Sequence, residues 1–368
     1  MTDSHEVYAG QWEILRRFLP EDLDSSARAA GAMRRKRGQV TRGEDLLRLL
    51  LMHIAGGLSL EQTVARAAVQ GLPKLNAMAL HKRLCTSHQW LAALTGHLLE
   101  GVRPLLQESG DCWNLGRRVR VLDATDVQEP GSSGTDWRVH YSLRLPEMCC
   151  DFFELTDKHG GESLRRLPVK RGDLVLVDRA YNDRQALGQI IHAGGDVILR
   201  YHSTNFPLLS ASGQRFDLLK RLRRLPLGKI GHWPVSFMAG ERRVQARICA
   251  LRKTPEQTER ARRKIKAKMR SSFERVKPAT LEYAEFIVVV CTVPAAEMSA
   301  RVALEFYRAR WQVELAFKRL KSLLHLGQLP KKKAASCRAW MQGKILTALL
   351  IERLMCEQRF FSPWGYRL

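Results

Sequence analysis

The first 110 residues place apolar side chains at helical spacing, which predicts an all-helical N-terminal region. Thr41 and Glu44, and again Ser59 and Gln62, match the spacing of a capping box, in which two side chains satisfy free amides at a helix start. Each pattern precedes an apolar run, LLRLLLMHIAGGL and then TVARAAV. We therefore expect two helices here, each beginning at one of these caps.

A break and a further short helix follow the second run. Gly71 and Pro73 interrupt the apolar pattern, and a helix is expected from about Met78 to Cys85. Two helices joined by a glycine-containing turn are typical of helix-turn-helix DNA binding, in which Lys82 and Arg83 would contact DNA. The same arrangement is common in helical bundles that bind no DNA, so the sequence leaves both interpretations open.

From residue 118 the pattern changes to short apolar strands. RVRVLDAT and DLVLVDRAY each carry an aspartate at or near the end, and WRVHYSLRL and CCDFFELTD lie between them. A short helix is expected near residues 162–166, and the helical run DRQALGQIIHAGG precedes the strand DVILRYH. Strands followed by alternating helix and strand predict an α/β layer structure.

Residues 203–295 combine turn-rich stretches with the probable strands HWPVSFMA, RVQARICAL and EFIVVVCTV. Residues 252–277 hold eleven Lys and Arg against three Glu. Such a run is often only a solvated helix face, but on a basic protein it favours a surface that follows DNA phosphates, with Arg262, Arg263 and Lys264 as contacts. A long helix is expected from Glu297 to just before Gly327, and AWMQGKILTALLIERLMCEQ predicts a last helix packed on the core.

The composition indicates a polyanionic partner. Lys and Arg number 61 against 37 Asp and Glu, a net charge of +24 that favours nucleic acid over a membrane surface. With 45% hydrophobic residues the chain can bury a large core, yet no apolar run approaches the roughly 20 residues of a membrane span. The start has no signal-peptide pattern. Eight scattered cysteines without a CxxC pair are expected to be reduced thiols of a cytoplasmic protein.

Four polar side chains of the long helix fall within an arc of roughly 60° at about 100° per residue: Tyr307, Arg310, Glu314 and Lys321. Arg310 and Glu314 alone form a common ion pair of a solvated helix. That interpretation does not require a phenol and a second cation in line with them. The stripe is therefore a candidate for chemistry as well as for solubility.

Two strand aspartates complete a possible site. Asp123 in VLDATD and Asp178 in LVDRAY each follow an apolar strand, where an aspartate is unusual unless a turn, a helix cap or a site requires it. Asp126 should face away from Asp123 because strand side chains alternate. Together with Glu314, the two aspartates would repel one another unless a pair of Mg²⁺ ions compensates their charge, and such a pair can cleave and join phosphodiesters.

These motifs resemble the DDE transposases of the insertion-sequence-four family. The family signature Y-x2-R-x3-E-x6-K is matched by the stripe at every position, and the contexts of Asp123 and Asp178 match its two aspartate motifs. The resemblance covers about residues 40 to 355. It implies that the three carboxylates are catalytic and hold two Mg²⁺ ions, which Mn²⁺ can replace, while Tyr307, Arg310 and Lys321 bind DNA.

The resemblance also implies the fold: an α/β catalytic core with a ribonuclease H-like mixed sheet flanked by helices. On that basis we expect an all-helical DNA-binding domain over residues 1–110 and the first part of the core over 111–202. A mostly β insertion with the basic segment follows over 203–295, and the second part of the core with a C-terminal helix over 296–368. Family members often use an aromatic side chain of the insertion to stack on a flipped base, and Phe286 and Trp233 are the candidates, although either could be a core residue.

The expected function is Mg²⁺-dependent cleavage of element ends and strand transfer into target DNA by a cut-and-paste route through a hairpin end. The expected partners are double-stranded DNA, as terminal inverted repeats and as target, and a second copy of the chain assembled on that DNA. No membrane is expected, and the protein should work in the bacterial cytoplasm with the nucleoid. Two alternatives are a ribonuclease H-like nuclease that only cleaves and a domesticated DNA-binding regulator without catalysis.

Overall fold

The computed structural model describes residues 12–33, 39–108, 116–145, 147–271, 276–330 and 332–358. The first eleven residues, for which the sequence indicates no signal peptide, lie outside these ranges. Within the described ranges, no helix combines the length and apolar character needed to cross a membrane. The described cysteines are all free thiols, and Cys112 and the side chain of Cys356 lie outside the described part.

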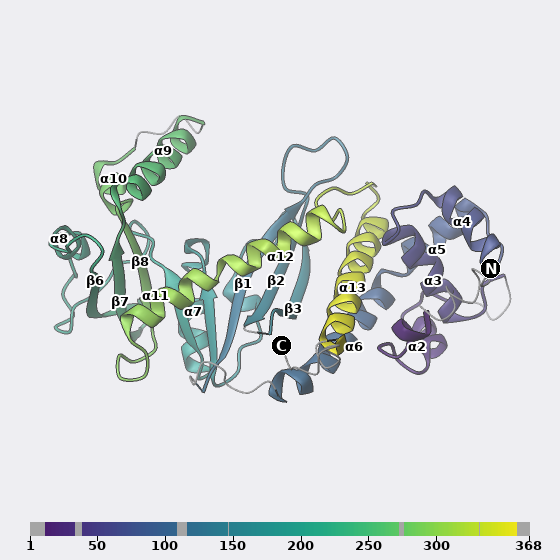
Figure 1. The fold of residues 1–368 in the computed structure, drawn as a ribbon, viewed down its shortest axis with the longest axis horizontal. Helices are drawn as coiled ribbons and strands as arrows, with labels where there is room; N and C mark the ends of the chain where they lie inside the picture. Colours follow the sequence, from purple (N-terminus) through teal and green to yellow (C-terminus); the bar gives the residue numbers. More distant parts are fainter. Residues whose placement is uncertain are drawn as a thin grey trace.

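The N-terminal region is helical, as expected (Figure 1). Its helices are α2 (Leu23–Ala29), α3 (Gly43–Ile54), α4 (Leu60–Val69), α5 (Ala77–Thr86) and α6 (His88–Glu108). The capping box of Ser59 and Gln62 at the start of α4 is confirmed by hydrogen bonds in both directions. The expected box of Thr41 and Glu44 is wrong: α3 is preceded by Arg42 without a side-chain cap. The amide of Gly43 donates instead to the carboxylate of Asp24, and Glu44 accepts from the indole of Trp12 at 2.8 Å.

A single mixed sheet forms the centre of the molecule, which confirms the α/β expectation. Its strands are β1 (Arg118–Val127), β2 (Trp137–Leu145), β3 (Cys149–Asp157), β4 (Asp173–Val177), β5 (Asp196–Arg200), β6 (Ile230–Ala239), β7 (Arg242–Arg252) and β8 (Phe286–Cys291). They lie in the order β3-β2-β1-β4-β5-β8-β7-β6. The three strands of residues 203–295 therefore continue the same sheet, through the antiparallel pairing of β8 with β5.

Strand direction determines which residues meet at one edge. β1, β4 and β5 are parallel neighbours. β8 is antiparallel to β5 and β7 is antiparallel to β8, so β7 runs in the same direction as β5. The carboxyl ends of β1, β4, β5 and β7 therefore lie along one edge of the sheet, which we call the carboxyl edge.

Helices cover both faces of the sheet. Its remaining helical elements are the short 3₁₀ turns η1 (Leu164–Arg166) and η2 (Arg179–Tyr181), α7 (Arg184–His192), α8 (Leu218–Arg223), α9 (Pro255–Ser271), α10 (Pro278–Tyr283), α11 (Ala300–Ala309), α12 (Trp311–Ser322) and α13 (Ala334–Gln358). One core joins a sheet face to α11, α12, α13 and the N-terminal helices, and a second lies between the opposite face and α7 and α8. Figure 1 shows α13 between the sheet and the N-terminal helices, with α8, α9 and α10 at the far end.

The long helix expected from Glu297 is in fact two helices. α11 ends at Ala309 and α12 begins at Trp311, and the amide of Arg310 bonds to the carbonyl of Tyr307 three residues back. The backbone at Arg310 stays right-handed, with φ −52° and ψ −32°, so α11 and α12 run nearly in line across the sheet (Figure 1). The tightened turn lies where the Arg310 side chain reaches the sheet edge.

Candidate active site

Three carboxylates meet at the carboxyl edge of the sheet. In the parallel pairing of β1 with β4, Val121 lies opposite Leu176. Asp123 and Asp178 each stand two residues further along their chains, so the register places them side by side. Glu314 lies in the first turn of α12, the helix that packs against β1 and β2.

Two side chains of the predicted stripe connect these carboxylates. The guanidinium of Arg310 donates to Asp123 Oδ2 at 3.1 Å and also to Glu314 Oε1. The hydroxyl of Tyr307 donates to Asp178 Oδ1 at 3.3 Å, and the Arg310 guanidinium lies 5.8 Å from the centre of the Tyr307 ring. Five of the six residues that the sequence predicts for the site, all except Lys321, therefore form one connected cluster.

The environment of the cluster makes negative charge costly. Burial raises the pKa of Asp123 to about 6; the nearby Glu162 and Asp178 carboxylates add to this rise, while the amide of Ala124 and the Arg310 guanidinium oppose it. The side chain of Glu314 is 58% exposed and faces solvent. The buried carboxylate of Asp123 therefore requires a cation beside it.

Arg310 is the cation that balances these charges. Within the described ranges, no three His, Cys, Asp or Glu side chains are grouped closely enough to hold a metal ion. Arg310 contacts both Asp123 and Glu314, so any cation bound by that pair would compete with the guanidinium. As expected, Asp126 takes no part: it is exposed, and its carboxylate pairs with Arg138 at 3.1 Å.

The chain is similar to bacterial transposases over most of its length. The family described as the transposase DDE domain matches residues 156–350. The sequence is also 34% identical to the putative transposase InsL for insertion sequence element IS186A of Escherichia coli strain K12, over 94% of this chain and 93% of that protein. The chain belongs to the DDE transposase family. It is therefore an enzyme that cleaves DNA and transfers strands.

Further relatives agree with the assignment. The transposase for insertion sequence element IS421 of Escherichia coli is 34% identical over 94% of this chain and 93% of its own length. The transposase for IS231F of Bacillus thuringiensis subsp. israelensis is 24% identical over 66% of this chain and 57% of its own. A piggyBac transposase synaptic complex with hairpin DNA superimposes with a TM-score of 0.42 at 9% identity, over 95% of this chain and 80% of that one. A likeness of that size adds nothing to the assignment.

Lys321 of the transposase lies apart from the cluster. It is exposed near the end of α12, about 20 Å along the helix axis from Tyr307 at 1.5 Å per residue. No carboxylate of the described residues pairs with it, and its aliphatic stem lies beside Gly327. The structure therefore does not join this member of the signature to the other three.

The two aromatic candidates for base stacking differ in exposure. Phe286 is 2% exposed and belongs to the second core, where the Arg252 guanidinium lies 5.6 Å from the ring centre. Trp233 is half-buried against the same core. Both lie on the sheet face that α7 and α8 cover. The sequence pattern predicts the strands but not which face is covered, so it could not distinguish a core aromatic from an exposed one.

The predicted basic contacts divide into free and engaged side chains. Lys82 on α5 and Lys264 on α9 are exposed, and Arg263 is exposed beside Glu259 at 3.6 Å. Arg83 is half-buried and donates to the carbonyl of Ala32 at 3.2 Å, which ties α5 to the chain after α2. Arg262 likewise bonds to the carbonyl of Leu281 and pairs with Glu285 at 2.6 Å. Residues 272–275 and the side chains of Lys268 and Arg270 lie outside the described part.

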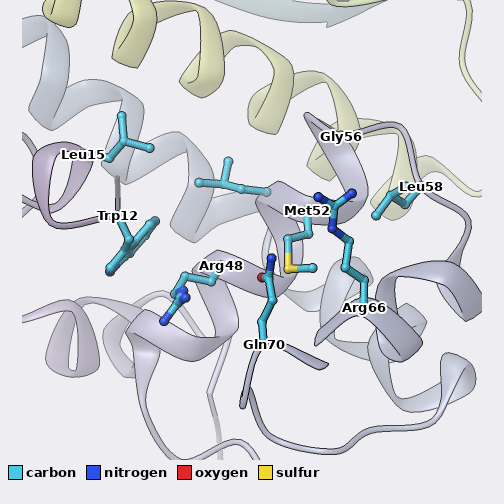
Figure 2. Close-up of a pocket in the computed structure, with 9 residues that line it drawn as sticks. Trp12, Leu15, Arg48, Met52, Gly56, Leu58, Arg66 and Gln70 are labelled. Carbon is cyan, nitrogen blue, oxygen red and sulfur yellow. The ribbon is translucent and has the colours of Figure 1, made fainter. Parts of the chain in front are cut away.

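The N-terminal helices contain a pocket that the sequence did not indicate (Figure 2). Trp12, Met52 and Leu58 line it together with Arg48 and Arg66, and no carboxylate is among its lining residues. The Arg48 guanidinium lies 5.6 Å from the centre of the Trp12 ring. The pocket is thus apolar with a positive rim, and it lies in a different region of the chain from the carboxylates.

Proposed function

We propose that this transposase is a cut-and-paste enzyme of the insertion-sequence-four type with a ribonuclease H-like core. It would cleave element ends and join the freed 3′-hydroxyl to target DNA, using two Mg²⁺ ions that Mn²⁺ can replace. The observation that carries this proposal is the convergence of Asp123, Asp178 and Glu314 at one sheet edge, with Arg310 and Tyr307 bonded to them. The sheet order and the parallel strands β1, β4 and β5 support the choice of core.

The chemistry of the three carboxylates fits the proposed ions, and metal binding would require Arg310 to leave Asp123 and Glu314, since the described acidic side chains are not grouped closely enough to hold an ion in this structure. DDE transposases generally use divalent metal ions, and carboxylate oxygens are the ligands that Mg²⁺ prefers. Asp123, Asp178 and Glu314 would hold the ions. When bound, they would activate an attacking oxygen and stabilise the leaving oxygen of a phosphodiester. The raised pKa of Asp123, caused first by burial, is consistent with a carboxylate that requires positive charge nearby.

The residues around the carboxylates would then bind the DNA end. Arg310, once released from Asp123 and Glu314, can pair in a bidentate manner with a backbone phosphate. Tyr307 can donate its hydroxyl to a phosphate oxygen. Exposed Lys321 is free to bind DNA further along α12. Together these three side chains would hold a sharply bent hairpin end, in which fixed cations offset phosphate repulsion.

The remaining basic surfaces would bind the rest of the DNA. We assign recognition of the terminal repeats to the N-terminal helices over residues 1–110, where Lys82 is exposed and Arg48 and Arg66 line a pocket without acids. The insertion over residues 203–295 would contribute α9, and the two parts of the core would span 111–202 and 296–368. A homodimer would assemble on DNA and act at the bacterial nucleoid.

A strand-transfer assay separates this function from its alternatives. Purified protein is incubated with a labelled duplex that carries the inverted repeats flanking its gene and with a supercoiled target plasmid, with and without Mg²⁺. A transposase yields joined products that depend on Mg²⁺. A nuclease yields cleaved ends without joining, and a regulator yields a shifted band without cleavage. Either of the last two results would contradict the proposal.

A further inference from the structure

Along the carboxyl edge, the charged residues change from acidic to basic beyond Asp178. β5, the next strand of the sheet, ends at Arg200, and β7, which runs in the same direction, is followed directly by Lys253. Arg179 follows Asp178 at the end of β4. One edge of the sheet thus carries carboxylates over β1 and β4 and cations over β5 and β7.

Arg200 is partly buried and forms no ion pair with the described carboxylates. Its guanidinium makes one hydrogen bond, to the carbonyl of Phe286 at 3.3 Å, although the group has five N–H donors. It lies 5.9 Å from the centre of the Tyr307 ring, and none of the described carboxylates lies within ion-pair distance. By contrast, buried Arg120 pairs with both Asp151 and Asp173.

Lys253 and Arg179 add two more cations without a partner acid in the described ranges. The ammonium of Lys253 donates only to the carbonyl of Ala284, at 2.7 Å. The backbone carbonyl of Glu285 accepts from the Lys253 amide, but the Glu285 carboxylate is already paired with Arg252 at 3.1 Å and with Arg262 at 2.6 Å.

The crowding of like charges affects both partly buried cations. Burial lowers the pKa of Lys253 to about 8, and the charges of Arg200 and Arg179 lower it further. Burial lowers the pKa of Arg200, and the charges of Arg179 and Arg310 lower it further, while the Tyr307 hydroxyl and the Asp178 carboxylate oppose the shift. A fold that holds such a cluster together has a place for an anion.

We propose that Arg200, Lys253 and Arg179 form a binding site for a backbone phosphate of the DNA strand held in the active site, adjacent to the phosphate that is cut. The inference rests on the proposed function and extends it. Tyr307 links the two halves, because Arg310 and Arg200 lie 5.8 and 5.9 Å from the same ring centre. A strand that crosses from the carboxylates toward β7 would therefore pass Tyr307 and reach the three cations.

Charge-neutral variants test the site through binding alone. Lys253→Gln and Arg200→Gln are compared with Lys170→Gln, which removes the same charge from an exposed side chain at the opposite edge, before β4. Binding of the inverted-repeat duplex is measured without Mg²⁺ at several salt concentrations. Loss of one phosphate contact should lower the slope of log affinity against log salt by about 1 and weaken binding about tenfold at low salt. Lys170→Gln should leave both unchanged.

A methylphosphonate scan then locates the phosphate. Single neutral linkages are placed along the end duplex and, separately, along a target duplex. At one position the neutral linkage should weaken binding of the wild type but not of Lys253→Gln, because the same contact cannot be lost twice. The duplex that contains this position identifies whether the phosphate belongs to the element end or to the target.

The outcomes that would overturn the inference are distinct from those that would overturn the proposed function. If Lys253→Gln keeps the wild-type salt slope and responds to every neutral linkage as the wild type does, the cluster binds no phosphate. If the wild type binds these duplexes but never joins them, the proposed function fails while the phosphate result stands. Because Arg200→Gln could unfold, a thermal melt accompanies each variant, and partly exposed Lys253 carries the test on its own.

Discussion

Several charged residues of this transposase are held in ion pairs. Arg310 is held by Asp123 and Glu314, and Arg138 by Asp126. Asp123 and Asp178 could be recognised from sequence because an acid rarely follows an apolar strand. Arg200 is the last residue of the strand DVILR, but an arginine at the end of a strand is so often solvated that the sequence alone did not single it out.

The carboxylates are expected to be essential for cleavage and dispensable for binding. Replacing Asp123, Asp178 or Glu314 singly by Ala should lower the cleavage rate by roughly a thousandfold or more, since the proposed ions would contribute several kcal/mol. DNA affinity should change little because it rests on basic residues elsewhere. Cleavage is followed on gels and binding by mobility shift.

Asp126→Ala is the matched control, because this aspartate lies on the same strand but pairs with Arg138. It should cleave normally. An inactive Asp126→Ala together with an active Asp123→Ala would mean that the wrong aspartate of β1 has been assigned.

The buried ammonium group of Lys344 leads to a prediction about how the free energy of unfolding depends on pH. It is 1% exposed on α13, its ammonium lies 4.8 Å from the centre of the Trp340 ring, and burial lowers its pKa to about 8. Below pH 8 the folded state carries a buried charge, a cost of about 3 kcal/mol that the ring offsets by about 1–2 kcal/mol. Lys344→Met should therefore raise the free energy of unfolding at pH 7 by about 1–2 kcal/mol.

The pH dependence follows from the sign of the shift. Between pH 8 and the unfolded value of 10.5, the unfolded chain binds more protons at this lysine than the folded chain, so wild-type stability rises with pH relative to Lys344→Met. Urea unfolding at pH 7 and pH 9.5 measures the difference. If the difference in free energy of unfolding between the wild type and Lys344→Met is the same at both pH values, Lys344 keeps its proton in the folded state across this range.

Among the elements, the two helices α11 and α12 determine the geometry of the site. Their near-continuity across the sheet was predictable from the run of helix-forming residues, whereas the break at Arg310 was not. A sequence pattern reports helical preference residue by residue, but the tightened turn arises where the Arg310 side chain meets Asp123, 187 residues earlier in the chain. The burial of Phe286 similarly depends on α7 and α8, which cover that face of the sheet.

The stripe on these helices should affect later steps more than the first cut. Arg310→Ala and Lys321→Ala should retain first-strand nicking better than hairpin formation or resolution, because a bent end concentrates phosphate charge that these cations offset. Tyr307→Phe should show a milder form of the same defect. The products are resolved over time on gels that separate nicked, hairpin and double-cut DNA.

Lys318→Ala provides the control, since Lys318 is exposed on the same helix but outside the signature. Equal loss of nicking and later steps in all three stripe variants would mean that the stripe only holds Glu314 in place. Normal products from all three variants would mean that the stripe is only a solvated helix face.

At the scale of the whole molecule, the composition indicated the partner better than the fold. The net charge of +24 was visible in the composition, and most strands and helices were predicted from apolar spacing. The order of strands in the sheet, and so the meeting of Asp123 with Asp178, depends on pairing between distant segments that no local pattern specifies. The sequence could therefore nominate the carboxylates without giving their contacts.

Salt should weaken DNA binding steeply. If six to ten phosphates are contacted, affinity should fall by roughly 10³–10⁵ between 50 and 200 mM salt. Neutralising the exposed cations Arg260, Arg263, Lys264 and Lys266 of α9 should reduce this slope. Arg262 is left intact because it holds Glu285 and Leu281. Mobility shifts across a salt series measure the slope. An unchanged slope would mean that the basic face of α9 is solvated and does not contact DNA.

The distance along the chain between the parts of the active site has a consequence for synthesis. Asp123 and Arg310 are 187 residues apart, and β1 and α12 meet only after the strands of residues 203–295 have been made and paired. At a synthesis rate of about 5–20 residues per second, Arg310 would therefore leave the ribosome roughly ten seconds or more after Asp123. Until then a nascent chain has no guanidinium to pair with Asp123, so the cluster of the candidate site can form only late in synthesis.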